Sequence, residues 1–174
     1  MRIVVPALLL GALAACVARD PQVVAPDSLG LAATPATAAI SVDGSQMTTQ
    51  LQPRFGCAAY TYPLDGRAAF EAAMRSAAAT NARPNAGRVD IVGEQVSAAM
   101  DATSGIVGGA AISVTVRATL RNPGAASLEA TGRSTAQTGG LGGCDSIGPT
   151  LAEAYRDALR ALGAQVAARL RGAS

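Results

Sequence analysis

The chain has 174 residues, a formal net charge of +2 and an apolar fraction of 49%, and it contains neither histidine nor lysine. The missing side chains exclude a Ser-His-Asp or Cys-His relay, Schiff-base chemistry and Walker-type phosphate binding. The basic residues are not clustered, so nucleic-acid binding is not expected. A hydrolase that uses carboxylates alone is the enzymatic alternative left open; its candidate residues are Asp65, Asp90, Glu94 and Asp101. Their spacing does not favour a catalytic pair, and we expect a protein without enzymatic activity.

The amino-terminal segment has the layout of a secretory signal. A short basic region at Arg2 precedes an apolar run from Ile3 to Leu13, and two alanines follow it. The run is about half as long as the roughly 20 apolar residues that a membrane-spanning helix needs. We therefore expect residues 1–15 to be removed as a signal peptide rather than retained as a transmembrane anchor.

The signal ends in Leu13-Ala14-Ala15-Cys16, which resembles the lipobox of bacterial lipoproteins. The resemblance implies that Cys16 becomes the first residue of the mature chain, that its thiol receives a diacylglycerol and that its amino group is acylated, for example with palmitate. Two or three acyl chains hold a protein stably on a membrane. Val17 stands where an aspartate would favour the inner membrane, so an outer-membrane anchor with the domain facing the periplasm is implied. The alternative is an ordinary signal peptide followed by a chance cysteine.

The segment after the lipobox predicts a linker. Residues 17–37 contain three prolines and many small residues without sustained periodicity, which is typical of flexible, partly extended chain. We expect residues 16–37 to form the lipidated cysteine and a flexible tether. Residues 38–174 are expected to form a single α+β periplasmic domain.

If Cys16 carries lipid, Cys57 and Cys144 remain as a pair. An even remainder in an oxidising periplasm predicts one disulfide, and two buried free thiols are the alternative. Tyr60 and Tyr62, close to Cys57, are interpreted as packing around that disulfide, with a docking surface as the alternative. A metal site would have only carboxylates and these two distant cysteines as ligands, so neither a metal nor another cofactor is expected.

The first half of the predicted domain contains a strand, a helix and a second strand. A short strand is expected within residues 38–44, and Asp65 is the expected N-cap of a helix over 69–80. Residues 87–103 predict a long strand whose alternation of apolar and polar residues changes phase. A bulge at Val92-Gly93 would explain that change.

The second half predicts a hairpin and a final helix. Strict alternation of apolar and polar residues indicates strands over 111–121 and 127–137 with one face in solvent. A capping box formed by Thr150 and Glu153 predicts the start of a helix whose apolar stripe runs to Leu170. The complete order predicts a two-layer α+β sandwich of about four mostly antiparallel strands with two helices on one face.

This order of elements behind a lipobox and a tether is similar to that of the LptE-like lipoproteins of lipopolysaccharide transport, which have two helices over a four-stranded sheet and sit inside an outer-membrane barrel. The resemblance is one of architecture and carries no functional residue across. It implies a non-enzymatic accessory or assembly subunit of an envelope complex, with an outer-membrane or envelope protein as partner. The alternative is a periplasmic binding module for a lipidic or anionic small ligand held between the helices and the sheet.

Arg117, Arg121 and Arg133 share the predicted outward face of the hairpin. Arginine binds phosphate groups in a bidentate manner, so these residues form the candidate binding face for phosphate or lipopolysaccharide headgroups. In the alternative, Glu129 pairs with Arg117 and Arg121 in ordinary surface ion pairs, each worth well under about 1 kcal/mol.

Overall fold

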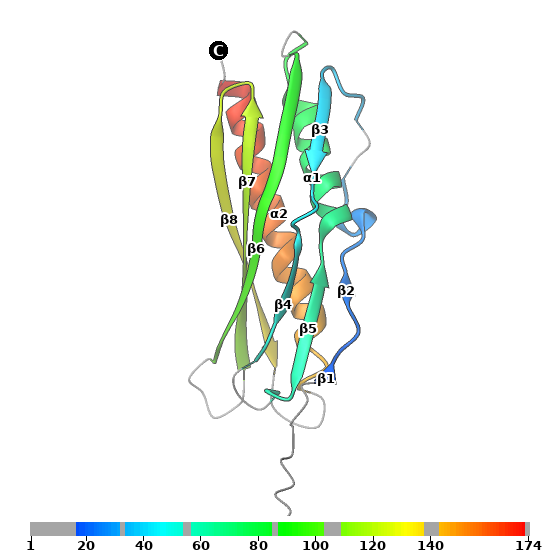
Figure 1. Cartoon of the computed structure of the whole chain (residues 1–174), viewed down its shortest axis with the longest axis vertical. Helices are drawn as coiled ribbons and strands as arrows, with labels where there is room; N and C mark the ends of the chain where they lie inside the picture. Colours follow the sequence, from blue (N-terminus) through cyan, green and yellow to red (C-terminus); the bar gives the residue numbers. More distant parts are fainter. Residues whose placement is uncertain are drawn as a thin grey trace, which may run out of the picture.

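The structure is a computed structural model that describes residues 17–31, 34–53, 57–84, 87–102, 109–137 and 143–172. In chain order its elements are β1 (Val17–Ala18), β2 (Gln22–Val23), the 3-10 helix η1 (Pro26–Leu29), β3 (Ala39–Asp43), β4 (Thr48–Leu51), β5 (Tyr60–Asp65), α1 (Arg67–Asn81), β6 (Arg88–Ala102), β7 (Gly109–Asn122), β8 (Ala126–Gln137) and α2 (Ile147–Gly172). They form an elongated molecule with α1 and α2 packed against each other on one side of the strands (Figure 1). The predicted α+β architecture is confirmed. Among the described residues there is no helix long and apolar enough to cross a membrane.

The strands form two sheets rather than the single sheet expected. In the larger sheet the order is β3-β6-β7-β8, with β3 parallel to β6 and the other neighbours antiparallel. In the smaller sheet β4 pairs with β5 antiparallel, and β1 and β2 pair with β5 parallel. The division arises because β3 ends at Asp43 and the chain then turns, so that β4 joins β5 instead of continuing along β6.

β6 changes its pairing register near its middle. The β6–β7 ladder shifts register between Asp90 and Ile91 and again between Gly93 and Gln95, and the second shift confirms the predicted bulge near Gly93. It explains why the buried positions of β6 pass from Ile91 to Val96 with a change of parity. A Cβ atom on Gly93 would lie 2.8 Å from Met47 Cε and 3.1 Å from Phe70 Cζ, so a larger residue here would require these side chains to shift.

The core lies between the larger sheet and the two helices. β7 alternates as predicted, and its inward side chains are at most 2% exposed: Ala110, Ile112, Val114, Val116, Ala118 and Leu120. The predicted apolar stripe of α2 is buried as well; it consists of Leu151, Tyr155, Ala158, Leu159, Leu162, Val166 and Leu170. Full burial of one large aliphatic side chain is worth about 1.5–3 kcal/mol, so this layer is a main source of stability.

α2 begins one turn earlier than predicted, at Ile147. Thr150 lies inside the first turn, where its hydroxyl donates to the Ser146 carbonyl at 2.8 Å. Glu153 accepts a hydrogen bond from the Ser134 hydroxyl of β8, also at 2.8 Å, instead of closing a cap. The predicted capping box is therefore wrong, because the helix begins before Thr150 and Glu153 is engaged by β8.

Residues 17–31 differ from the flexible tether expected there, and we call them the docked segment. β1 and β2 run along one edge of β5, and the Val24 N–H donates to the Asp65 carbonyl at 3.1 Å. Val24 is fully buried, and Leu29 at the end of η1 is 8% exposed. The prolines are typical of a linker, but the free edge of β5 supplies backbone partners, and the burial of these two side chains stabilises the contact.

Candidate functional site

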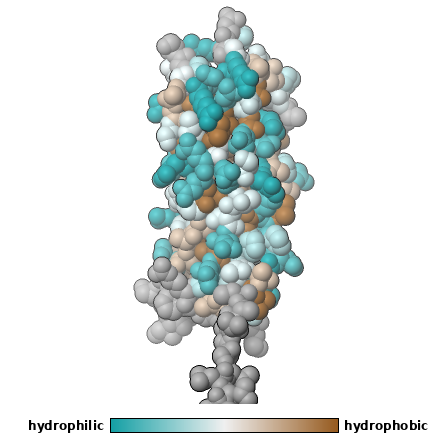
Figure 2. All heavy atoms as spheres, viewed as in Figure 1, coloured by the Kyte–Doolittle hydropathy of each residue, from teal (hydrophilic) through white to brown (hydrophobic). Residues whose placement is uncertain are grey.

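The first candidate surface is the outer face of the larger sheet, on the side away from the helices. Arg117 and Arg121 on β7 and Arg133 on β8 all lie on this face and are exposed. Figure 2 shows the molecule in the view of Figure 1, with hydrophilic residues beside pale ones and scattered apolar residues between them. The composition of this face is therefore that of a solvated sheet surface.

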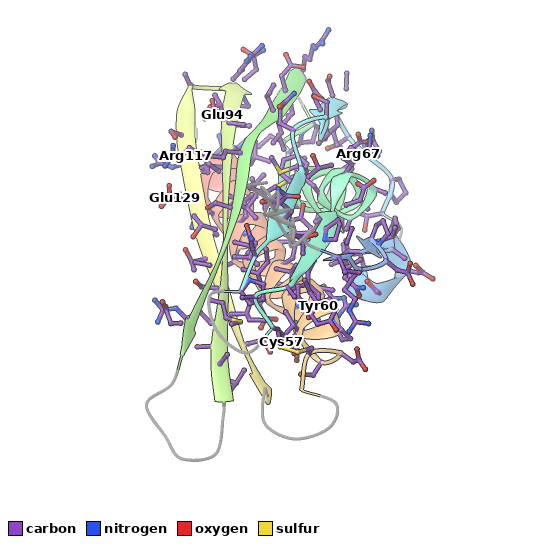
Figure 3. All side chains as sticks on the ribbon, turned by 60° about the horizontal axis from the view of Figure 1, so that its bottom comes forward. Cys57, Tyr60, Arg67, Glu94, Arg117 and Glu129 are labelled. Atoms are coloured by element: carbon purple, nitrogen blue, oxygen red, sulfur yellow. A yellow bond between two sulfur atoms is a disulfide. The ribbon has the colours of Figure 1, made fainter. Side chains whose placement is uncertain are left out.

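Several charges on the outer sheet face are paired within it. Arg117 donates to Glu129 across the β7–β8 pair at 2.7 Å, and this hydrogen bond raises the pKa of Arg117. Thr119 donates to Glu94 beside them, and Figure 3 shows the Arg117, Glu129 and Glu94 side chains on the same side of the strands. The two partners of the ion pair are about half exposed, so solvent screens their attraction and the pair contributes little to stability. Arg117 therefore forms the ordinary surface ion pair with Glu129 that the alternative predicted.

The three arginines lie at three different levels of the sheet. Arg121 is near the end of β7 and interacts electrostatically with Asp43 and Asp90. Arg133 stands opposite Ser113 in the strand register. From Arg121 to that level β7 advances by eight residues, about 27 Å at roughly 3.4 Å per residue. A single phosphate group cannot contact arginines so far apart, so this face presents separate charges rather than one phosphate clamp.

The second candidate site lies at the end of the molecule where β1 begins (Figure 1). The guanidinium carbon of Arg19 is 4.2 Å from the centroid of the Tyr60 ring, and its Nη2 is 3.0 Å from Asp145 Oδ1. Buried Tyr62 donates its hydroxyl to the Cys144 carbonyl at 2.8 Å, and burial raises its pKa. We call Arg19, Tyr60, Tyr62 and Asp145 the β1-end cluster. Its contacts fasten the docked segment to the segment that precedes α2.

Cys57 and Cys144 form a disulfide at the same end, with Cα atoms 5.7 Å apart and a sequence separation of 87 residues. The predicted bridge is confirmed, and Figure 3 shows Cys57 close to Tyr60. Tyr62 is 2% exposed, in agreement with the interpretation of this tyrosine as packing beside the disulfide. The bridge joins the turn before β5 to the turn that precedes α2.

Two carboxylates of the hydrolase alternative, Asp65 and Asp90, each pair with a separate arginine. Asp65 accepts from Arg67 at 2.5 Å, and Asp90 accepts from Arg88 at 2.6 Å. These hydrogen bonds lower the pKa of both carboxyl groups, whereas a general acid needs a raised pKa. Asp101 lies toward the other end of β6 from Asp90. Within the described ranges, no three histidine, cysteine or acidic side chains come together as a metal site would require.

The layer between the helices and the sheet is filled by side chains. Val114 on β7 and Leu159 on α2 are both fully buried there, so side chains occupy the position in which the binding-module alternative would hold its ligand. A groove of about 260 Å³ lies on the surface between α1 and α2 beside Leu29, below the roughly 300–1,000 Å³ of usual ligand pockets. A groove of about 510 Å³ lies between Pro123, after β7, and Arg169 near the end of α2. Both grooves are open to solvent and lie on the surface of the molecule.

Cys16, the predicted lipidation residue, lies outside the described residues. The residue that follows it, Val17, begins β1. Sequence reasoning did not find the β1-end cluster, because a segment with three prolines indicates a linker. The pair Val23-Val24 was the available signal, since two consecutive valines are typical of a strand.

Comparison with known proteins does not assign the chain to a family. No protein-family profile matches it, and no curated protein matches it. Among solved structures it is similar to a minor lipoprotein from Acinetobacter baumannii, with a TM-score of 0.43, 9% identity, and coverage of 78% of this chain and 90% of that one. It is also similar to a candidate lipoprotein from Caulobacter crescentus, with a TM-score of 0.43, 10% identity, and coverage of 79% and 93%. At these TM-scores the likenesses carry no argument about function.

Proposed function

We propose that this chain is a lipoprotein anchored in the outer membrane through Cys16, and that it works in the periplasm as a non-enzymatic accessory or assembly subunit of an envelope complex. The observation that carries the proposal is the sequence Leu13-Ala14-Ala15-Cys16 at the end of a short export signal. Val17, the residue directly after that cysteine, already pairs with β5 through β1, and this supports the proposal. The bridge between Cys57 and Cys144 suits an oxidising compartment.

The outer sheet face is the surface that we assign to the partner. A sheet that is covered by helices on one face presents its other face as a broad, regular surface. Besides the pair formed by Arg117 and Glu129, this face carries Thr115 and Thr131, whose hydroxyl oxygens are 2.9 Å apart. Short side chains allow another protein to approach the strands closely, and exposed charges at separate levels can set its orientation.

The proposal is tested by fractionation of cells that express the full chain with a carboxy-terminal tag. Wild-type protein is extracted gently from outer membranes and purified, and the proteins that accompany it are identified by mass spectrometry. Cys16→Ser removes the acceptor of the lipid. A sheet-face variant replaces Arg117, Arg121 and Arg133 by alanine, and a matched control replaces three exposed arginines of the helices by alanine, namely Arg75, Arg160 and Arg169.

We expect wild-type protein in the membrane fraction together with a stoichiometric envelope protein. Cys16→Ser should leave the membrane and retain its signal peptide, because processing follows lipidation in the lipoprotein family that the motif resembles. The sheet-face variant should keep its anchor and lose the partner by roughly tenfold or more, and the helix control should keep both. A normally processed, membrane-bound Cys16→Ser protein would contradict the anchor. A sheet-face variant with undiminished partner would contradict the assigned surface.

A further inference from the structure

We infer that the molecule stands on the membrane with its β1 end against the lipid headgroups and its long axis directed away from the bilayer. The inference rests on the proposed lipidation of Cys16 and names the surface that contacts the membrane. Its basis is the docked segment, residues 17–31, which takes the place of the flexible tether.

The first part of the docked segment is held on β5 by its backbone. The Val17 N–H donates to the Ala59 carbonyl at 2.7 Å, and the Arg19 N–H donates to the Thr61 carbonyl at 2.9 Å. The Arg19 side chain adds its contact with the Tyr60 ring and its ion pair with Asp145. The chain is therefore fixed from the first residue after the cysteine.

The later part of the docked segment is held by α2 as well. The Gln22 side chain packs over Gly148 in the first turn of α2, where a Cβ atom would lie 2.9 Å from Gln22 Cδ. Arg156 of α2 donates to the Ser28 hydroxyl at 3.2 Å, and Val24 between them is fully buried. Contacts with two elements of the domain oppose detachment of the segment.

These contacts fix the distance between the domain and its lipid. Val17 is the first residue of β1 and pairs with Tyr60 of β5, so a lipid on Cys16 is attached one residue before a strand of the domain, and one residue spans only about 3.8 Å. A free tether over residues 17–37 could extend by roughly 70 Å. Docking removes nearly all of this reach, and the acyl chains must therefore leave the molecule at its β1 end.

The β1 end also has a surface suited to headgroup contact. Its exposed residues include the small apolar side chains Val17, Ala18, Ala58 and Ala59, and Val17 is 56% exposed. The charged Arg19 and Asp145 are paired with each other. The carboxyl end of α2, near Gly172, lies at the opposite end of the molecule (Figure 1). Because α2 has 26 residues, the molecule extends at least about 39 Å along this direction.

The test is neutron reflectometry of the mature, lipidated protein on a supported bilayer of phosphatidylethanolamine and phosphatidylglycerol. Mass spectrometry first establishes the acyl chains on Cys16. The comparison variant carries an inserted valine and five Gly-Ser pairs directly after Cys16, so that a valine still follows the cysteine and the docked segment is unchanged. The ten glycine and serine residues of this flexible insert add a mean distance of roughly 18 Å between Cys16 and the docked segment. Val24→Asp, which places a charge at a buried position, is the variant that should detach the segment.

We expect a wild-type protein layer of at least about 39 Å that begins at the headgroups without a water layer between. The insertion should create a water layer of roughly 18 Å, and Val24→Asp should create a wider, more diffuse one. A wild-type layer already separated by water, and not shifted by the insertion, would overturn the inference. A wild-type layer thinner than α2 is long would overturn it too, since the molecule would then lie flat. Protein without acyl chains, or not retained on the bilayer, would instead overturn the proposed function and the inference with it.

Discussion

At the scale of single residues, two glycines on facing elements have opposite roles. A Cβ atom on Gly132 of β8 would lie 2.0 Å from the Ala154 carbonyl oxygen and 2.4 Å from the Ala158 nitrogen. These are backbone atoms of α2 and cannot rotate away. A Cβ atom on Gly163 of α2 would meet the Ala77 Cβ at 3.7 Å, an ordinary contact. Gly132 therefore sets the distance between α2 and the sheet, and Gly163 does not.

We expect Gly132→Ala to lower the free energy of unfolding by about 3 kcal/mol, because α2 must move away from β8. Gly163→Ala should leave it unchanged or raise it by up to about 1 kcal/mol, since alanine has the higher helix propensity. Urea denaturation followed by circular dichroism measures both. Equal effects of the two substitutions would contradict the packing role of Gly132.

At the scale of the elements, the start of α1 shows how a neighbour decides which side chain caps a helix. Gly66 occupies the N-cap position expected for Asp65. A Cβ atom on Gly66 would lie 2.3 Å from the Tyr155 ring, so no capping side chain fits there. Asp65 accepts instead from the Arg67 N–H at 3.2 Å and from the Arg67 guanidinium. The carboxylate still satisfies an amide of the first turn, from one position earlier.

The side-chain hydrogen bond from Arg67 lowers the pKa of Asp65 from its ordinary value of 3.8. Ionised Asp65 therefore stabilises the folded protein above that pH, and the contribution is lost as the pH falls from 3.8 through the lower folded pKa. We expect Asp65→Asn to lower the free energy of unfolding at neutral pH by less than about 1 kcal/mol, with a difference that shrinks on acidification. The exposed Asp101→Asn is the control, expected within about 0.5 kcal/mol of wild type. A difference that grows as the pH falls would contradict the assignment.

At the scale of the whole molecule, the two sheets are joined by contacts between residues far apart in the sequence. The Tyr155 hydroxyl of α2 donates to the Gly66 carbonyl after β5 at 3.0 Å, and the disulfide joins Cys57 to Cys144. The docked segment lies against both β5 and α2. α2 thus packs on the larger sheet and also contacts β2 and β5 of the smaller one.

Replacement of both Cys57 and Cys144 by alanine should lower the free energy of unfolding of the mature protein by on the order of 4 kcal/mol. The reason is that a bridge across 87 residues restricts the unfolded chain. Urea denaturation of the double variant and of oxidised wild-type protein measures the difference. Thiol counting on the unreduced mature protein should find no free thiol, and two free thiols would contradict the bridge.

The sequence by itself determined the features that depend on local order and on covalent chemistry. The alternation over β7 and the three- and four-residue spacing along α2 predicted which side chains are buried, because each period corresponds to one face of the element. The phase change at Gly93 predicted the bulge. Two cysteines beyond Cys16 predicted the bridge, and the missing histidine and lysine excluded whole classes of catalysis.

Only the tertiary structure decided the features whose partners lie far away in the chain. The docked segment has the composition of a linker. It is ordered because β5, about 40 residues later, has a free edge with which β2 pairs, and because Val24 becomes buried there. The division into two sheets and the glycine cap of α1 under Tyr155 have the same origin. Each depends on which surfaces pack against each other in the folded chain, and local periodicity does not predict those tertiary contacts.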